Sequence, residues 1–466
     1  MKSLEVVDLF AGAGGTSSGL VAAARLRTDN VKLTAINHNR KALETHQANF
    51  PWARHILTEL QSVDPYEVAP EGSLDGLVAS PECTFFSRAR GGKPIRPQDR
   101  ASPWYLGRWI RKLDIPWVLI ENVPEIVKWG PLTEEGKPQK SATGSYFRLW
   151  VNLFRKHGYQ FEYRILNAAD YGDATTRRRF FAIARKDQKP IQWPKPTHAR
   201  KPKGDEKKWR PAREIIDFNL RGESIFQRKK PLSENTMKRI IAGLEKYSNP
   251  ELKPFLVMLE HSLLEPGNRI RDIELPLPSI TTAKGGAIAL AQPFLSVYHG
   301  STGKEERTRS INDPLPALDT SNRIALAEPF LVEYKGKSKT KGLNEPLPSI
   351  TGTPYHYLAE PFLIEYYGRG QPRSIDSPMP TIPTRDRFAL LQPVMIEGKE
   401  YRLDIFYRML KPRELGAAMG FPRDYMFLGN QNDQVRQIGN AVAVNMAKSL
   451  ISALLNPGKE TLMEAL

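Results

Sequence analysis

Short apolar strands alternate with helical patterns through the first 185 residues of the chain. The first strand is predicted at residues 4–9, and it runs through a glycine-rich turn into a helix predicted over residues 16–25. Strands that alternate with helices favour a parallel sheet covered on both faces. The sequence therefore predicts an α/β fold built on a mostly parallel, Rossmann-like sheet.

Further elements continue this pattern and return near the C-terminus. Apolar runs and helical periodicity predict five more strands and four more helices, the strands at residues 32–36, 74–79, 117–121, 163–166 and 180–184 and the helices at 40–49, 145–157, 412–419 and 439–455. Sheets of this kind bind ligands at the carboxyl ends of their strands. Residues that follow the strands are therefore the candidates for a functional site.

The charge balance indicates the class of partner. The 466 residues carry a formal net charge of +17, and a surplus of this size favours a polyanion such as nucleic acid, although basic proteins without such a partner exist. The chain has no run of eighteen apolar residues and no signal-like N-terminal pattern, so we expect no membrane partner and a cytoplasmic location. The single cysteine, Cys83, excludes an intramolecular disulfide and a cysteine-rich metal site, and we predict no metal.

Residues 186–230 differ in composition from the segment before them. They are rich in proline and lysine and hold 14 Lys/Arg against 6 Asp/Glu. Basic loops serve either as solvated linkers or as surfaces that contact phosphate, and the sequence leaves both readings open.

An internal repeat occupies residues 254–395. The triplet PFL begins at Pro254, Pro293, Pro329 and Pro361, with a degenerate PV at Pro393. Between these triplets lie PLPSIT or related segments, which begin at residues 276, 314, 346 and 378, and the later copies are 32 residues apart. Each unit is predicted to form a short strand, a turn and another short strand. The array either presents an extended surface to a long ligand or only enlarges a scaffold.

The segment DLFAGAGGTSSGL, residues 8–20, joins the first strand to the first helix. Its small residues let backbone amides approach a ligand, which is typical of a nucleotide pocket. Gly12 and Gly14 fit a dinucleotide fingerprint, whereas Ser17 holds the third glycine position. A tight structural turn is the alternative.

Two further segments place reactive groups after strands. Cys83, in ASPECTFFSRARGGKP, follows a strand end with basic residues nearby, which suits an exposed nucleophilic thiolate rather than an inert buried thiol. Glu121, in ENV, could act as a general acid if its surroundings raise its pKa, and an ordinary buried glutamate is the alternative.

The segment YGDATTRRRFFAIA, residues 171–184, contains three consecutive arginines. If a strand begins there, Arg177 and Arg179 share one face, since side chains alternate along a strand. Two guanidinium groups on one face suit an anion or a polarised carbonyl, and a solvated edge is the alternative.

Taken in order, these segments resemble the motifs of the DNA cytosine carbon-5 methyltransferase family. The glycine-rich start is similar to the S-adenosylmethionine motif, and the Cys83, ENV and TTRRR segments are similar to the catalytic cysteine, glutamate and paired-arginine motifs. RELGAAMGFP, residues 413–422, and RQIGNAVAVNMA, residues 436–447, resemble the last two motifs. The amino-acid sequences of these motifs are most similar to those of members from bacteria and their phages.

The resemblance implies a fold and a division into domains. We expect an S-adenosylmethionine-dependent methyltransferase fold with a smaller, mainly β target-recognition domain that contains the repeats. The expected spans are 1–185 for the catalytic and cofactor-binding domain, 186–405 for target recognition, and 406–466 for a segment that completes the catalytic domain.

The resemblance also implies a reaction on a cytosine rotated out of double-stranded DNA. Cys83 would attack carbon 6 of the ring, Glu121 would assist at nitrogen 3, and Arg177 and Arg179 would orient the base and the cysteine region. S-adenosyl-L-methionine is the implied cofactor. The residues expected to bind it are Phe10, Ala11, Gly12, Gly14, Asn37, Glu59, Pro81, Asn440 and Ala441.

Three positions depart from the family's pattern. Glu82 stands where most members have proline before the cysteine, Thr175 where the arginine motif begins with glutamine, and Asn37 where many members have an acidic residue. We expect a monomer that serves restriction–modification or protects phage DNA. The alternatives are an RNA cytosine methyltransferase and an inactive DNA-binding homologue.

Overall fold

The computed structural model describes residues 3–82, 101–134, 137–220, 269–282, 287–293 and 405–456, short stretches between 222 and 240, and the backbone of strands between 255 and 404. The chain forms two units, each described by itself. The first comprises Met1–Ile216, Glu274–Ala287 and Leu410–Leu466, and the second comprises Asp217–Ile273 and Ile288–Met409. These units divide the chain differently from the three expected spans, because residues 186–216 and 274–287 fold with the first unit.

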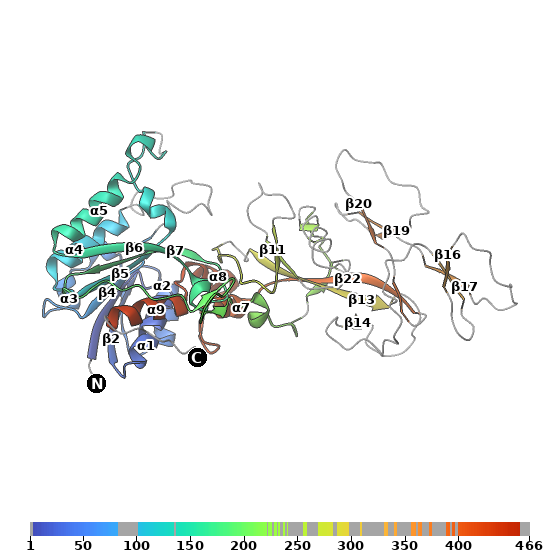
Figure 1. Ribbon diagram of the computed structural model, residues 1–466, viewed down its shortest axis with the longest axis horizontal. Helices are drawn as coiled ribbons and strands as arrows, with labels where there is room; N and C mark the ends of the chain where they lie inside the picture. The colour runs from blue at the N-terminus through green and yellow to red at the C-terminus, as the bar shows by residue number, and fades with distance from the viewer. Residues whose placement is uncertain are drawn as a thin grey trace. The chain divides into compact units, whose positions relative to one another are not determined.

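The first unit is built on a seven-stranded sheet (Figure 1). Five strands are parallel, and β7 runs antiparallel to both of its neighbours, β5 and β6. Across the sheet the order is β3 (Arg54–Leu57), β2 (Asn30–Asn37), β1 (Ser3–Leu9), β4 (Gly76–Ala79), β5 (Trp117–Asn122), β7 (Arg178–Arg185) and β6 (Gln160–Asn167). The predicted mostly parallel α/β sheet is confirmed.

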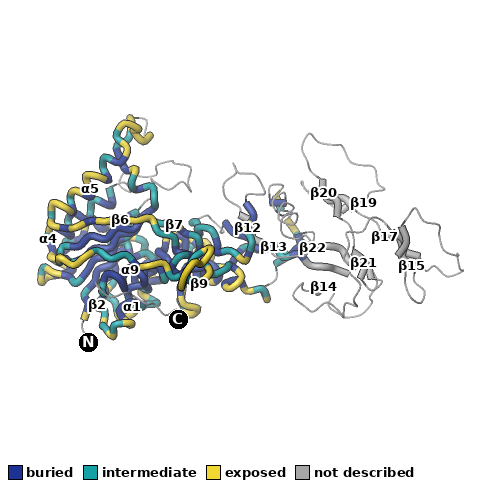
Figure 2. Tube along the Cα trace, viewed as in Figure 1, coloured by how far each residue is buried: buried dark blue, intermediate teal, exposed yellow. Residues whose placement is uncertain are grey.

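Helices cover both faces of this sheet, as the sequence pattern predicted. The helices in chain order are α1 (Gly15–Arg25), α2 (Arg40–Asn49), α3 (Pro65–Val68), α4 (Leu106–Lys112), α5 (Ser145–Lys156), α7 (Pro412–Ala418), α8 (Gln431–Asn440) and α9 (Val444–Leu455). On one face, α4 and α5 bury Trp109, Trp150 and Phe154 against apolar side chains of β1, β4, β5 and β7. The central strands β4 and β5 are buried along their whole length (Figure 2).

One predicted element is wrong in extent. Residues 439–455 are predicted as a single helix, but the chain leaves the helical conformation at Ala441 and Ala443, and α9 begins only at Val444. The break brings the backbone of Val442 against Gly15, where a Cβ atom would collide with the Val442 carbonyl oxygen. Strand β3 and helices α3, α4 and α8 were not predicted; β3, α3 and α4 are short, and α8 is mostly polar in sequence.

One described segment is apolar enough to resemble a membrane span. Gln431–Leu455 is long and apolar enough to cross a membrane, but 83% of its most apolar part is buried inside the folded chain. Core helices of folded proteins meet the same criteria of length and composition, so the finding is weak evidence for a membrane segment.

The second unit is described mainly by its strands. An antiparallel sheet has the order β10 (Glu223–Ser224), β22 (Lys399–Met409), β13 (Ile288–Val297), β11 (Phe255–Met258) and β12 (Ile270–Asp272), with β14 (Thr308–Arg309) on β13 and β21 (Val394–Ile396) on β22. Two small antiparallel sheets are also formed, one by β15 (Phe330–Glu333), β16 (Thr340–Gly342) and β17 (His356–Ala359), the other by β18 (Phe362–Glu365), β19 (Pro372–Ser374) and β20 (Phe388–Leu391).

The two small sheets share one pairing register. Phe330 pairs with Gly342 and Ala359, and Phe362 pairs with Ser374 and Leu391. Each position in the second sheet lies 32 residues after its counterpart, which is the period of the sequence repeat. The PLPSIT-like copies that begin at residues 314, 346 and 378 lie outside the described residues.

Helices α1 and α9 approach each other closely at glycines of α1. A Cβ atom added to Gly19 would lie 2.5 Å from the Cβ of Ala447 and 2.7 Å from the backbone nitrogen of Lys448. Glycine therefore lets the last helix pack on the first one.

We expect Gly19→Ala to destabilise the protein, although alanine is the better helix former by about 1 kcal/mol. The added methyl meets backbone that cannot move, and overpacking of this kind costs about 1–3 kcal/mol. Gly107→Ala in α4 is the matched control, because its methyl would meet only the Cδ2 atom of the flexible Leu153 side chain, at 2.6 Å. Denaturant unfolding should show a loss for Gly19→Ala and none for Gly107→Ala; equal stabilities would contradict the expected close packing.

The N-terminus of α9 is capped from a distant segment. The buried carboxyl group of Asp173 accepts hydrogen bonds from the backbone N–H groups of Asn445 (3.3 Å) and Met446 (3.1 Å) and from the side-chain amide of Asn445 (3.0 Å). Burial raises the pKa of Asp173 to about 8.

This raised pKa predicts a pH dependence. Between about pH 4 and pH 8 the folded chain keeps a proton on Asp173 that the unfolded chain has released, so the free energy of unfolding falls as the pH rises. Asp173→Asn removes this titration and should flatten the fall, while costing about 1 kcal/mol at pH 5 through a weaker cap. Unfolding curves at several pH values would test this, with the exposed Asp205→Asn as the control. A slope unchanged by Asp173→Asn would refute the assignment.

Candidate active site

The glycine-rich segment forms a tight loop at the carboxyl end of β1. Phe10, Gly12 and Gly14 all have positive φ angles, of 60°, 56° and 90°. A non-glycine residue such as Phe10 adopts this conformation only at an energetic cost, and such strain is concentrated at functional sites. Backbone hydrogen bonds from Ala11 to Ile36 (3.2 Å) and from Gly14 to Ala11 (3.0 Å) hold the loop closed.

The segment that follows α7 contacts this loop through Tyr425. The hydroxyl of Tyr425 donates a hydrogen bond to the carbonyl of Ala13. A Cβ atom on Gly14 would lie 2.5 Å from the same hydroxyl and 2.9 Å from Phe50. Only glycine therefore fits at position 14, for reasons of both space and backbone conformation.

A buried chain of polar groups lies under the loop. The hydroxyl of Ser17 donates to Asp8 (2.6 Å) and contacts Nε2 of His46 (2.9 Å), whose Nδ1 lies 2.8 Å from Nε2 of His55. Burial raises the pKa of Asp8 to about 7 and lowers that of His46 to about 3. This chain ties β1, α1 and α2 together. The sequence pattern did not indicate that these four side chains contact one another, although Ser17 was noted because it holds the third glycine position.

The other expected cofactor residues lie at neighbouring strand ends or at the end of α8. Asn37 is the buried last residue of β2, and its side-chain oxygen accepts a hydrogen bond from the backbone of Asn39 (2.8 Å). Glu59 is exposed just after β3, and Asn440 is the exposed last residue of α8, followed by the buried Ala441. Their roles stay predictions.

Glu121 lies near the carboxyl end of β5 and faces two arginines. Its side chain is buried, and Nε of Arg179 lies 3.3 Å from its Oε1 atom. Burial raises the pKa of Glu121, while the positive charges of Arg179 and Arg177 and a hydrogen bond from Ser80 act in the opposite direction. The structure thus brings together the expected glutamate and both expected arginines.

The loop that leads to the cysteine is anchored next to this group. The side-chain amide of Asn122 donates to the carbonyl of Pro81 (3.1 Å), and the hydroxyl of Ser102 donates to the carbonyl of Glu82 (3.1 Å). Glu82, which replaces the family's proline, pairs with His38 at 3.2 Å. Cys83 itself lies outside the described residues, so its nucleophilic role stays a prediction.

A segment of the first repeat docks beside the arginines. Within Glu274–Ala287, the backbone N–H of Leu277 donates to Ala174 (2.8 Å), and its carbonyl accepts from the backbone N–H of Thr176 (2.6 Å). No sequence pattern indicated that this PLPSIT copy belongs to the same unit as the TTRRR segment.

The same segment also holds side chains of the arginine motif. Thr175, where the family has glutamine, donates its hydroxyl to the carbonyl of Pro278 (3.0 Å). The buried Arg177 donates from Nη1 to the carbonyl of Ile280 (3.2 Å). One end of the Arg177 guanidinium is therefore fixed by backbone of the first repeat.

The described residues contain no group of three or more His, Cys, Asp or Glu that could hold a metal ion. The described groups at this edge are the buried Glu121 carboxyl and the guanidinium groups of Arg177 and Arg179. Sequence analysis missed the supporting residues Ser80, Asn122, Ser102, His38 and Tyr425, because each acts through contacts with distant segments.

A family model described as C-5 cytosine-specific DNA methylase matches residues 4–256 and 354–456. The Type II methyltransferase M.Sau3AI of Staphylococcus aureus is 29% identical over 192 residues, covering 40% of this chain and 44% of that protein. M.SacI of Streptomyces achromogenes is 29% identical over 210 residues, covering 42% and 51%. The chain thus spans about half the length of these curated relatives.

Two solved structures match the chain at low sequence identity. DNMT2 of Spodoptera frugiperda has a TM-score of 0.49 and 14% identity, covering 97% of this chain and all of that one. EhMeth of Entamoeba histolytica has a TM-score of 0.47 and 12% identity, covering 98% of both chains. These values do not by themselves define a shared function.

The sheet order, the reversed β7 and the family match agree with the expected S-adenosylmethionine-dependent methyltransferase fold. The match covers more than three quarters of the chain and includes both ends of the first unit. The chain belongs to the C-5 cytosine-specific DNA methylase family.

Proposed function

We propose that the chain transfers a methyl group from S-adenosyl-L-methionine to carbon 5 of a flipped-out cytosine in duplex DNA. The observation that carries this proposal is the buried Glu121, which faces Arg179 and Arg177 at the sheet edge where the Cys83 segment begins. A carboxyl group whose pKa is raised by burial keeps its proton to a higher pH than an exposed glutamate and can give it to a developing negative charge.

Glu121, Arg179 and Arg177 would each have a role at the cytosine ring. Once Cys83 attacks carbon 6, negative charge develops on the pyrimidine ring, and Glu121 relieves it by donating its proton or a hydrogen bond at nitrogen 3. Arg179, whose Nε lies 3.3 Å from Glu121, fixes the direction of the carboxyl group. Arg177, held by the Ile280 carbonyl, orients the base and the cysteine region.

Methyl transfer would proceed through a covalent bond between Cys83 and the base, and no step changes an oxidation state through an added oxidant or reductant. The Cys83 sulfur forms a bond to carbon 6, which makes carbon 5 nucleophilic toward a methyl group. As carbon 5 takes the methyl group, the bond from that methyl to the sulfonium sulfur would break and the neutral thioether would leave. Transfer of the carbon 5 proton to water would then restore the aromatic ring and expel the Cys83 thiolate. The anchored carbonyls of Pro81 and Glu82 would set where this thiolate lies.

The glycine-rich loop fits the cofactor. Its strained Phe10, its glycines with positive φ and its small residues leave backbone groups open to a ligand at the end of β1. Asn37 at the end of β2, Glu59 after β3, Pro81 after β4, Asn440 at the end of α8 and Ala441 next to it would complete the site. When bound, S-adenosyl-L-methionine supplies the electrophilic methyl group.

The partner and the biological role follow the same family. The proposed substrate is double-stranded DNA, bound by a monomer in the compartment where that DNA lies, with target recognition in the second unit and its repeats. Because the matched relatives are named Type II methyltransferases, we propose a role in restriction–modification or in the protection of phage DNA.

Bisulfite sequencing of plasmid DNA from cells that express the protein should reveal protected cytosines in one recurring context. Cys83→Ala should abolish this protection while the protein stays folded, because the covalent intermediate cannot form. Transfer RNA from the same cells, sequenced in parallel, is the comparison. Protection of RNA alone would replace DNA by RNA as the substrate, and protection of neither would indicate an inactive binder.

Glu121→Gln should slow methyl transfer in a single turnover by about 10²–10⁴-fold, the usual contribution of a general acid. Binding of duplex DNA should change little, since the substitution keeps the size of the side chain. Glu44→Gln on the exposed face of α2 is the matched control and should retain the wild-type rate. A Glu121→Gln rate within about threefold of that control would exclude proton donation by Glu121, because general acids contribute far more.

A further inference from the structure

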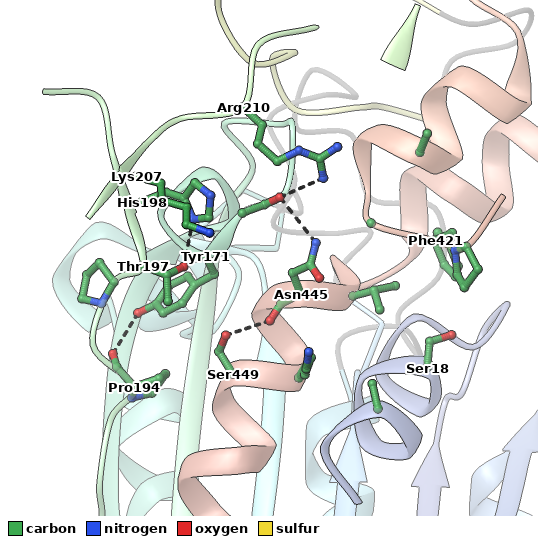
Figure 3. A pocket seen from close by; sticks show the side chains of 18 of the residues that line it. Ser18, Tyr171, Pro194, Thr197, His198, Lys207, Arg210, Phe421, Asn445 and Ser449 are labelled. Carbon is green, nitrogen blue, oxygen red and sulfur yellow. Dashed lines mark hydrogen bonds between the residues drawn. The ribbon is translucent and has the colours of Figure 1, made fainter. Parts of the chain in front are cut away.

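A large groove lies on the face of the first unit that carries α1 and α9 (Figure 3). It has a volume of about 1770 Å³ and is walled by these two helices, the loop after α7 and residues 192–215 of the basic stretch. Neither Glu121 nor the two arginines of the candidate site line it; Glu121 borders a separate small cavity. The groove therefore has no part in the proposed chemistry.

The basic stretch forms a folded wall of this groove and is not a linker in its first half. The backbone N–H of Thr197 donates to the carbonyl of Asp170 (2.9 Å), and the indole N–H of Trp209 donates to the Asp170 carboxylate (2.9 Å). Arg210 donates to the carbonyl of Gly172 (3.3 Å). Strands β8 (His198–Ala199) and β9 (Lys207–Lys208) pair between these anchors.

Positive charge predominates along the groove. Its lining includes four acidic residues and seven Lys/Arg residues, the latter being Arg25, Lys195, Lys207, Lys208, Arg210, Arg423 and Lys448. Part of the charge is compensated, since Arg210 pairs with Glu214 at 2.9 Å. Lys207 and Lys208 are exposed along β9.

Lys448 is the least ordinary of these cations. Only 8% of its surface is exposed, and burial lowers its pKa. Within the part of the chain that the structure describes, it has no hydrogen-bond or ion-pair partner. Lys448 lines the groove, and its Nζ atom is not sealed from it. An anionic ligand in the groove would meet there a cation that no carboxylate of the described residues pairs with.

Aromatic rings also line the groove. Trp193 is held in place by Arg164, 5.0 Å from its ring centre, and by the hydrogen bond of its indole N–H to Glu162 (2.8 Å). Tyr171 and Phe421 lie in other walls, as Figure 3 shows, but both are buried, so the half-buried Trp193 is the ring of these three that a base can reach. Basic grooves with aromatic rings suit a phosphodiester strand whose bases stack. The volume exceeds the roughly 300–1,000 Å³ of small-molecule pockets, which favours an extended ligand.

We propose that this groove binds a phosphodiester strand of nucleic acid, with Lys448 and the lysines of β9 as its phosphate contacts. It is a second nucleic-acid site of the first unit, separate from the candidate active site. The proposal does not depend on methyl transfer, so its test can fail while the proposed function stands, or succeed while that function fails.

Binding of fluorescently labelled oligothymidylate to the full-length protein tests this directly, because the probe contains no cytosine. Lys448→Gln and the double variant Lys207→Gln/Lys208→Gln should each bind about tenfold more weakly, and the salt dependence should fall by about 0.7 logarithmic units for each lost phosphate contact. Lys156→Gln, at the exposed end of α5, is the charge-matched control. Dissociation constants and salt slopes equal to this control would overturn the proposal.

Two further measurements locate the strand and guard against misfolding. Oligothymidylate with 5-iodouracil should photocrosslink to peptides that contain Trp193 or Tyr425; crosslinks confined to the second unit would overturn the proposal. Lys448→Met keeps an apolar stem of similar length and removes the charge, so it should fold with a melting temperature close to that of the wild type, yet bind the probe weakly. A Lys448→Met variant that binds as tightly as the wild type would also overturn it.

The source of the strand is distinguished with duplex substrates. If DNA that flanks the target enters the groove, the Lys207→Gln/Lys208→Gln variant should raise KM for a long duplex but leave KM for a short one unchanged. If a separate strand is the ligand, both values of KM should stay at the wild-type level while oligothymidylate binding weakens. In both cases the Lys207→Gln/Lys208→Gln variant must bind oligothymidylate more weakly than the wild type.

Discussion

The return of the C-terminal segment onto the first helix is the packing on which the rest of the first unit depends. Gly15 and Gly19 leave so little space that the backbone at Val442 and Lys448 lies directly against α1. This contact completes the wall behind the glycine-rich loop and forms one side of the basic groove. The break between α8 and α9 exists for the same reason, since a continuous helix could not bring Val442 to Gly15.

Buried ionisable groups concentrate where segments from distant parts of the chain meet. Asp8, Glu121 and Asp173 are all buried carboxyl groups with raised pKa values, and each joins elements that lie apart in sequence. Asp8 and Asp173 have hydrogen-bond partners that explain them structurally. Glu121 also has partners, since it pairs with Arg179 and shares a hydrogen bond with Ser80.

The first repeat and the basic stretch have structural roles that their composition did not indicate. The PLPSIT copy at residues 276–281 fixes Arg177 through a backbone carbonyl and so contributes to the candidate site. Residues 192–215 form a wall of the first unit rather than a connection. A segment that looks solvated in sequence can thus be held by backbone hydrogen bonds, which composition does not reveal.

The sequence by itself determined the alternating elements, the mostly parallel sheet and the order of the motifs, because strand and helix periodicity and glycine turns are local properties. It also singled out Glu121, Arg177 and Arg179 as candidates, because they lie at or next to strand ends, and their catalytic roles stay predictions. Only the tertiary structure decided that Ser17 links Asp8 to His46, that Asp173 caps α9 and that Ile280 holds Arg177. These contacts join residues up to 273 positions apart, and pairing over such separations is set by how the chain packs, which leaves no local pattern to read.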